Sequence, residues 1–310
     1  MNTPLVSIVM PCYQAEATVG RTVDSILAQT LPDFELIAVD DGSTDGTGAL
    51  LDALAAQDAR IRVIHQQNGG VACARNAGMA AVRGRWLAFA DADDLLLPDA
   101  LFHLLSLDDG VSEILCSAFI MHHIGGQEED RLFACAQGDL QVVLESLVRG
   151  DSGLNPMYGK LYRTEWVQST GLSVPPGVKV GEDVLFNLEA FAHASSWRMD
   201  DCPVYVYTWG GDSAMARAQA DVYAKSQRML EGIAHFVQAH GLETALFRAH
   251  IDIYLRTLRK DRGRLRAALS LHYRTVGVIT RGVRFSQLCA KQKLYYLALR
   301  TLPCLSYFLP

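Results

Sequence analysis

Three carboxylates lie within four positions at the end of a short apolar stretch. Residues 86–90 (WLAFA) are too few for a helix, and Asp91, Asp93 and Asp94 follow directly. If the chain stays extended here, the two-residue period of a strand places Asp91 and Asp93 on one face, with Ala92 facing the other way. Two neighbouring carboxylates offer the oxygen ligands that a divalent cation prefers. The stretch therefore predicts a metal or ligand site at the end of a buried strand.

The same stretch also has a purely structural interpretation. Asp93 or Asp94 would then cap a helix that continues through Leu95 to Leu105, because a carboxylate accepts hydrogen bonds from the free N–H groups of a first helical turn. Acidic turns of this kind are common, so the stretch alone leaves both interpretations open.

Alternating strands and helices must position these acids. Apolar runs predict strands at residues 5–10, 34–39, 61–64 and 86–90. Apolar residues at helical spacing predict helices between them, which indicates an α/β domain with a mainly parallel sheet flanked by helices. Ligands of such sheets bind beyond the carboxyl ends of the strands. Asp40 and Asp41 follow the second predicted strand, so they share this edge with Asp91 and favour a binding site there.

The glycine pattern excludes several nucleotide-binding classes. Gly42, Gly46 and Gly48 do not have the G-x-G-x-x-G spacing, and residues 11–18, which follow the first predicted strand, contain no glycine. A nicotinamide-binding fold, a phosphate loop and a sugar nucleotidylyltransferase are therefore all disfavoured.

The composition describes a globular chain. The chain has 310 residues, half of them apolar, and a formal net charge of −6. This length is enough for two domains or for one domain with a long extension. The seven cysteines are scattered and form no Cys-x-x-Cys pair, which suits a reducing, cytoplasmic compartment. No apolar stretch approaches the roughly 18 to 20 residues that span a bilayer.

The positive charge gathers near the C-terminus. Residues 248–310 contain 13 Lys and Arg and only two acids, and the pattern from residue 221 onward is helical. Residues 283–310 would lie in a membrane interface, with basic side chains toward anionic headgroups. The alternative is a helical cap on the α/β domain with a solvated basic face. No nucleic-acid-binding motif accompanies the charge, so a nucleic-acid partner is not expected.

Four motifs, in this order and at this spacing, resemble one known family. They are VSIVMPCYQAEATV, ELIAVDDGSTDGT, QQNGGVACARNAGMAAVRG and RWLAFADADD. The chain resembles the inverting family 2 glycosyltransferases of bacterial capsule, lipopolysaccharide and exopolysaccharide synthesis, closely over residues 4–110 and more loosely to residue 213. The resemblance implies a GT-A, Rossmann-like catalytic domain over residues 1–215. Residues 1–110 would bind the nucleotide-sugar, 111–215 would face the acceptor, and 216–310 would form a helical basic C-terminal extension.

The resemblance also implies roles for the acids. Asp91-Ala92-Asp93 matches the Asp-x-Asp motif of the family, with Asp93 as the direct ligand of Mg²⁺ or Mn²⁺ and Asp91 nearer the ribose or sugar of the donor. Glu182-Asp183 matches the Glu-Asp motif at the start of a helix, with Asp183 as the catalytic base. The alternative is a helix N-terminus that simply favours acids.

Further residues are expected at the donor. The resemblance implies contacts from Pro11, Tyr13, Asp40, Asp41, Gly69 and Arg75. Asp40 and Asp41 would contact the base and ribose, and the Arg75 guanidinium would pair with the pyrophosphate or with Asp91. Each has a structural alternative. The two acids would form a turn with Ser43, Tyr13 would be a core residue, and Arg75 would make a salt bridge on a helix surface.

Three later segments carry weaker expectations. Residues 110–140, with the adjacent His122 and His123, are predicted to be an exposed loop without a metal ligand. Residues 204–208 are predicted to be an edge strand, and residues 209–213 a flap over the donor.

The expected activity is transfer of a single sugar, because the Gln-x-x-Arg-Trp motif of processive relatives is absent. The donor would be a nucleoside-diphosphate sugar, most simply a UDP-sugar. The acceptor would be a glycan or a polyprenyl- or other lipid-linked molecule, modified on the inner face of the plasma membrane. The alternative function is a non-catalytic sensor or scaffold that binds a nucleotide-sugar.

Overall fold

A computed structural model describes residues 3–131, 139–149, 153–178, 180–210 and 222–242, together with the single residues 286, 290 and 293. The predicted flap beyond Gly210 and almost all of the predicted membrane-facing segment 283–310 lie outside the described residues. None of the helices in the described part combines the length and apolar character that crossing a bilayer requires.

Strands and helices alternate in the first part of the chain, as predicted. The elements are β1 (Val6–Cys12), α1 (Val19–Leu27), β2 (Phe34–Asp40), α2 (Thr47–Gln57), β3 (Ile61–His65), α3 (Val71–Ala80) and β4 (Trp86–Phe89). The four strands pair in parallel in the order β3-β2-β1-β4. Their carboxyl ends therefore share one edge, where Asp40, Asp41 and the acids after β4 lie.

The second part of the chain extends this sheet in mixed orientation. Its elements are β5 (Leu95–Leu96), α4 (Ala100–Ser106), β6 (Ile114–His123), β7 (Gln127–Arg131), α5 (Leu140–Arg149), β8 (Lys160–Arg163), α6 (Thr164–Thr170), α7 (Glu182–His193), β9 (Trp197–Trp209) and α9 (Val222–His240). The sheet continues in the order β4-β8-β6-β9-β5, with β7 on β6. The β6–β9 pair is parallel, whereas β8 runs antiparallel to both β4 and β6.

The structure corrects the loop expected at residues 110–140. β6 and β7 form an antiparallel hairpin that pairs His123 with Gln127. The turn between them contains Gly125 and Gly126, both with positive φ. The polar residues that suggested a loop lie on the exposed end of this hairpin, where backbone pairing rather than burial holds the strands.

Two further expectations near the acids are wrong. Residues 204–208 do not form an edge strand, because β9 lies between β6 and β5. The helix that Asp93 or Asp94 was expected to cap does not include Leu95, because Leu95 and Leu96 form β5 and pair with β9. Helix α4 begins only at Ala100.

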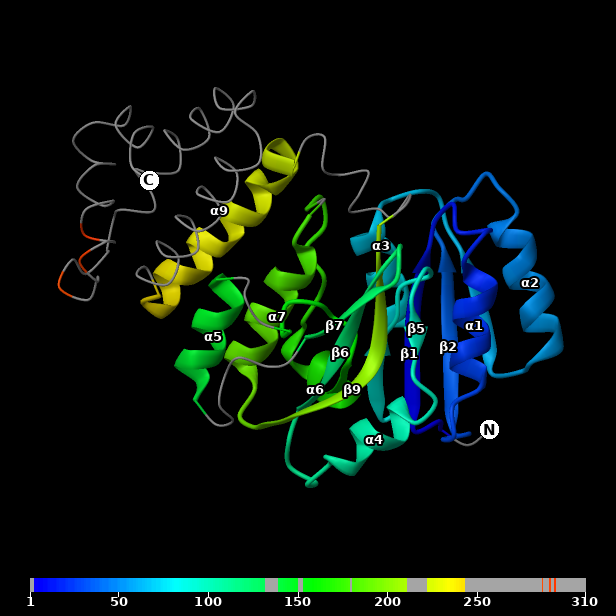
Figure 1. Cartoon of the computed structure of the whole chain (residues 1–310), viewed down its shortest axis with the longest axis horizontal. Coiled ribbons are helices and arrows are strands. Elements are labelled where there is room, and N and C mark those ends of the chain that lie inside the picture. Colours follow the sequence, from blue (N-terminus) through cyan, green and yellow to red (C-terminus); the bar gives the residue numbers. More distant parts are fainter. Residues whose placement is uncertain are drawn as a thin grey trace.

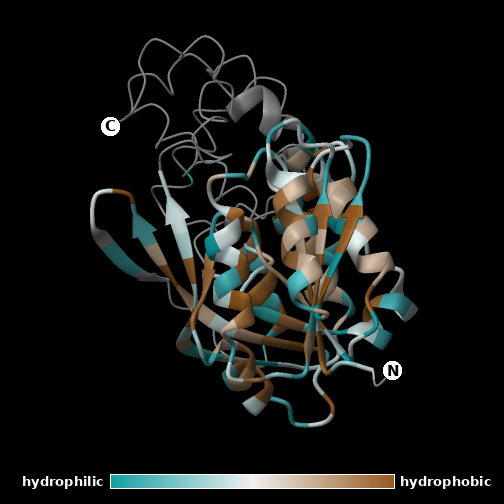
Figure 2. Cartoon of the chain, turned by 90° about the vertical axis from the view of Figure 1, so that its right-hand side faces the viewer, coloured by the Kyte–Doolittle hydropathy of each residue, from teal (hydrophilic) through white to brown (hydrophobic). Residues whose placement is uncertain are grey.

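Helices cover both faces of the sheet (Figure 1). On one face, Val9, Leu87 and Phe89 pack with residues of α3, α5 and α7. On the other, Ile8 and Met10 pack with residues of α1, α2 and α4. Figure 2 shows the hydrophobic colouring concentrated on the central strands. The alternation of buried side chains along each strand thus supplies two cores and leaves the strand ends for polar residues.

Helix α9, in the predicted C-terminal extension, packs on the helices that cover the sheet. Ile233, Phe236 and Val237 of α9 are buried in the same core as Phe186 of α7. Figure 1 shows α9 lying alongside α7. Gly181, which precedes α7, has φ +84°, and a Cβ atom there would collide with the Met229 side chain of α9. The start of α7 is therefore in direct contact with the extension.

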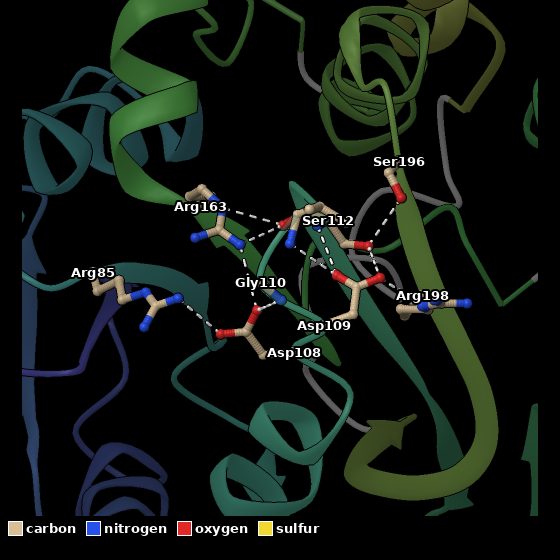
Figure 3. A network of polar contacts seen from close by, with 9 residues as sticks. Arg85, Asp108, Asp109, Gly110, Ser112, Arg163, Ser196 and Arg198 are labelled. Atoms are coloured by element: carbon tan, nitrogen blue, oxygen red, sulfur yellow. Dashed lines mark hydrogen bonds and ion pairs between the residues drawn. The ribbon is translucent and has the colours of Figure 1, made fainter.

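A network of polar contacts connects neighbouring strands at the edge of the sheet opposite the acids. Its labelled members are Arg85, Asp108, Asp109, Gly110, Ser112, Arg163, Ser196 and Arg198 (Figure 3). Asp108 accepts from Arg85, just before β4, and lies 3.4 Å from Arg163 of β8. Hydrogen bonds from Ser112 and Arg198 lower the pKa of Asp109. The network joins β4, β8 and β9 at this edge and leaves the carboxyl end of β4 for the site.

Candidate active site

The segment Asp91–Asp94, here called the acid loop, turns as soon as β4 ends. The Asp94 N–H donates to the Asp91 carbonyl at 3.2 Å, so residues 91–93 are not extended as the sequence argument assumed. Ala92 is buried in the core, whereas Asp91 and Asp93 are half-buried. The tight turn keeps both carboxylates near the strand end while preserving their partial contact with solvent.

Asp94 anchors the acid loop to β9. Its side chain is fully buried, and its two oxygens accept hydrogen bonds from the Thr208 N–H at 2.8 Å and the Tyr205 hydroxyl at 3.0 Å. The Tyr205 oxygen in turn accepts from the Asp91 N–H at 2.9 Å. Burial, together with the charges of Asp91 and Asp93, raises the pKa of Asp94 well above its usual range. This anchoring role was not predicted, because both of its partners lie more than 100 positions away.

Arg75 joins the acid loop to the start of α7. Its guanidinium donates to Asp91 Oδ1 at 2.8 Å and to Glu182 Oε1 at 2.7 Å, and the residue is only 6% exposed. Burial alone would lower the pKa of Arg75, but the charges of Asp91, Glu182 and Asp183 raise it above its usual range. The predicted pairing with Asp91 is present. The second pairing, with Glu182, was not predicted.

Asp183 lies one residue further along α7. It is half-buried, and its Oδ1 accepts a hydrogen bond from the Val184 N–H at 2.8 Å. Burial, and to a lesser extent the charge of Glu182, raises the pKa of Asp183 to about 7, although Arg75 opposes the shift. A carboxylate with this proton affinity is suited to accept a proton near neutral pH. The predicted base therefore lies one position from a residue bonded to the predicted donor-side arginine.

The acids after β2 hold neighbouring loops. Asp41 is buried, and its oxygens accept from the backbone N–H groups of Gly69 at 2.9 Å and Gly70 at 2.8 Å. Asp40 is also buried and accepts from the Ser43 N–H at 3.0 Å, as the turn alternative predicted. Both acids and Gly69 thus lie together at the edge where the carboxyl ends of the parallel strands meet. Their contacts with a nucleotide stay predictions.

Pro11 and Tyr13 lie at the end of β1. Pro11 is half-buried and pairs in register with Val39 of β2. Tyr13 is 51% exposed, so it is not a core residue. Its ring is available at the same edge as Asp40, and its contact with the donor stays a prediction.

His65, at the end of β3, was not predicted to belong to the site. Its Nδ1 lies 3.0 Å from Asp40 Oδ2, and its Nε2 lies 3.0 Å from Asp52 Oδ1 on α2. The hydrogen bond with Asp52, followed by that with Asp40, raises the pKa of His65. Its signal in the sequence is only that a histidine directly follows the third predicted strand.

This geometry gives a pH-dependent prediction. Because the folded-state pKa of His65 is raised, its stabilising effect is complete below the unfolded value of about 6.5 and is lost as pH rises through the folded value. His65 and Asp52 are exposed, so we expect His65 to contribute a loss of less than about 1 kcal/mol, and this part of the pH dependence should be absent in His65→Gln. Chemical denaturation from pH 6 to 9 measures it, with His235→Gln on the exposed side of α9 as control. Equal pH dependence in wild type and His65→Gln would contradict the prediction.

A cation at this edge would need ligands from the donor as well. Within the described residues, no three His, Cys, Asp or Glu side chains converge as a ready metal site. Asp91 and Asp93 are partly exposed and offer hard oxygen ligands. The residues present therefore fit one side of a magnesium or manganese ion, whose other ligands would be phosphate oxygens and water.

Sequence comparison identifies relatives of the chain. The model of the family described as "Glycosyl transferase family 2" matches residues 7–146. The glycosyltransferase EpsJ of Bacillus subtilis (strain 168) is 35% identical over 214 residues, covering 66% of this chain and 61% of EpsJ. The putative glycosyltransferase EpsH of the same organism is 30% identical over 247 residues, covering 77% of this chain and 70% of EpsH. The succinoglycan biosynthesis protein ExoO of Rhizobium meliloti (strain 1021) is 31% identical, covering 66% of this chain and 61% of ExoO. The chain thus spans less than two thirds of the length of EpsJ and ExoO.

Solved structures share the fold. TarS of S. aureus, residues 1–349 in complex with UDP-GlcNAc, superposes with a TM-score of 0.76 at 20% identity, over 97% of this chain and 89% of that 1–349 chain. A mannosyltransferase of Pyrobaculum calidifontis, in complex with GDP-Man and Mn²⁺, superposes with a TM-score of 0.50 at 18% identity, over 99% of this chain and 88% of that chain. These likenesses support the GT-A fold. The family model and the coverage of EpsH lead to one conclusion: the chain belongs to glycosyl transferase family 2.

Proposed function

We propose that this glycosyltransferase moves a single sugar from a UDP-sugar to a glycan or lipid-linked acceptor, with inversion at the anomeric carbon. One observation carries the proposal. The Arg75 guanidinium bonds both Asp91 of the acid loop and Glu182 beside Asp183, so the donor-side acids and the candidate base front one site. An inverting transfer needs this arrangement, because the base must act on the side of the sugar opposite the leaving diphosphate.

The side chains divide the reaction between them. Asp183 accepts the proton of the acceptor hydroxyl while the acceptor oxygen bonds to the anomeric carbon and the bond from that carbon to the diphosphate breaks. Asp93 and Asp91 would hold Mg²⁺ or Mn²⁺. When bound, such an ion stabilises the charge of the departing diphosphate. Arg75 holds Asp91 and Glu182 in place, and Asp40 and Asp41 border the nucleoside.

The choice of donor and pathway is supported by the relatives. TarS was solved with UDP-GlcNAc, and the mannosyltransferase with GDP-Man and Mn²⁺. ExoO is named for succinoglycan biosynthesis. A UDP-sugar, a divalent cation and a role in cell-surface polysaccharide synthesis are therefore the simplest proposal for this chain.

Calorimetric titration of UDP tests the donor site. We expect wild type to bind UDP at least about tenfold more tightly with Mn²⁺ than without it, and Asp93→Ala to lose this gain, because a metal ligand is missing. Asp99→Ala is the matched control, since Asp99 is an exposed aspartate shortly after the acid loop. UDP binding that is indifferent to both Mn²⁺ and Asp93 would overturn the metal assignment.

We also propose that residues 283–310 bring the enzyme to the inner face of the plasma membrane. The basic and aromatic composition of this segment supports contact with anionic headgroups. Deleting it should at least halve co-sedimentation with vesicles that contain anionic lipid, while neutral vesicles sediment neither form. Equal sedimentation of the full and shortened chains would refute the membrane role.

A further inference from the structure

Three tyrosine rings stack on one another beside the acid loop. Tyr158 lies parallel to Tyr205, with centroids 4.2 Å apart and an interplanar angle of 7°, and also stacks on Tyr207 at 5.6 Å and 20°. Tyr205 is fixed by its hydrogen bonds with Asp91 and Asp94. Tyr158 stacks on this fixed ring and Tyr207 stacks on Tyr158, so both rings are held near the acid loop.

Tyr158 and Tyr207 have unused hydroxyl groups. Within the described residues, neither the Tyr158 nor the Tyr207 hydroxyl makes a hydrogen bond, although Tyr158 is only 7% exposed. Neither oxygen is among the fully buried unpartnered atoms of the described chain, so both reach solvent. A ring that is more than nine-tenths buried but whose hydroxyl is open and unpartnered is suited to bind a ligand.

Acidic side chains near these two hydroxyls affect their pKa values. Burial raises the pKa of Tyr158 and of Tyr207, and Asp94, Asp91 and Asp183 add to both shifts. Both phenols are therefore protonated hydrogen-bond donors. The stacking on Tyr205, which bonds Asp91 and Asp94, holds both rings near the acid loop.

We infer that Tyr158 and Tyr207 form the subsite for the pyranose ring that is transferred, and that their hydroxyls donate hydrogen bonds to its oxygen atoms. This inference rests on the proposed function. The diphosphate is assigned to the acid loop and the acceptor hydroxyl to Asp183, so the transferred ring lies between them. Trp209, whose ring centroid is 6.2 Å from that of Tyr207, extends the aromatic surface along β9.

The test separates the sugar from the nucleotide. With Mn²⁺ present, calorimetry compares UDP with UDP-glucose, UDP-galactose and UDP-GlcNAc on wild type, and the sugar that adds most to the affinity of UDP is used further. Tyr158→Phe and Tyr207→Phe keep the stacked rings and remove one hydroxyl each. We expect each variant to bind that UDP-sugar roughly 3- to 10-fold more weakly and UDP itself unchanged, as the loss of one hydrogen bond predicts.

Controls and outcomes distinguish this inference from the proposed function. Tyr162→Phe removes a buried hydroxyl that bonds Asn187 and should leave the ratio of the two affinities unchanged. An unchanged ratio in the double Tyr158→Phe, Tyr207→Phe variant would overturn the inference alone, as would equal binding of UDP and all three UDP-sugars by wild type. A raised KM for acceptor with an unchanged ratio would assign the tyrosines to the acceptor and also overturn it. Failure of wild type to bind UDP or any UDP-sugar would overturn the proposed donor itself.

Discussion

Replacing Asp183 by asparagine is expected to reduce the rate of sugar transfer by about 10²- to 10⁴-fold, the usual contribution of a general base. The amide has nearly the same shape but does not accept a proton from the acceptor hydroxyl. UDP affinity should be unchanged, because the proposed donor site consists of the acid loop and residues at the ends of β1 and β2 and does not include Asp183. Transfer is measured as UDP released from a UDP-sugar in the presence of acceptor, and UDP affinity by calorimetry.

The pH profile of wild type gives a second readout of Asp183. Burial raises its pKa to about 7, and the base acts only when ionised, so kcat/KM should fall as pH decreases through about 7. Glu189→Gln is the control, since this exposed carboxylate lies on the same helix, α7. Full transfer activity in Asp183→Asn would refute the base assignment. Absence of transfer in wild type with intact UDP-sugar binding would favour the non-catalytic sensor or scaffold.

Replacing Arg75 by methionine is expected to have the second largest effect. Removing one partner of a buried ion pair leaves the others uncompensated, so the free energy of unfolding should fall by about 3 kcal/mol. Asp91 and Glu182 would also lose their shared donor, and kcat/KM should fall. Because Arg75 opposes the raised pKa of Asp183, the acid limb of the pH profile should move to higher pH.

Arg198→Met provides the comparison for Arg75→Met. Arg198 also pairs with an aspartate, Asp109, at 2.8 Å, but half of its side chain is exposed. A surface pair of this kind contributes about 0 to 1 kcal/mol. Denaturant unfolding of both variants measures the difference. Equal losses of stability, or an acid limb that does not move in Arg75→Met, would contradict a coupling between Arg75 and the base.

The first four strands were predictable because each forms from a local apolar run that ends at a polar turn. Once they pair in parallel, the acids after β2 and β4 necessarily share one edge. Sequence reasoning therefore located the acid loop without any knowledge of distant contacts. It did not predict the turn at Ala92, because the hydrogen bond from Asp94 to Asp91 competes with an extended backbone.

The unpredicted features depend on contacts between distant residues. β5 contains only two residues and exists because β9 pairs with it. Arg75 and Glu182 are separated by 107 positions, and Asp94 and Thr208 by 114. Such pairs leave no period in the sequence. The match of Glu182-Asp183 to a family motif indicated a base. Only the folded structure shows that Arg75 connects Glu182 to Asp91.

The contact between α9 and the start of α7 joins α9 to the helix that carries Asp183. Gly181 precedes α7, and Met229 of α9 lies so close that a side chain at position 181 would collide with it. A shift of α9 would therefore displace the backbone that carries Asp183. A membrane or protein that binds the C-terminal extension and favours one position of α9 would change the rate of transfer, and acceptor binding would in turn change its affinity for that partner. Attachment to a surface and catalysis would then be thermodynamically coupled within one chain.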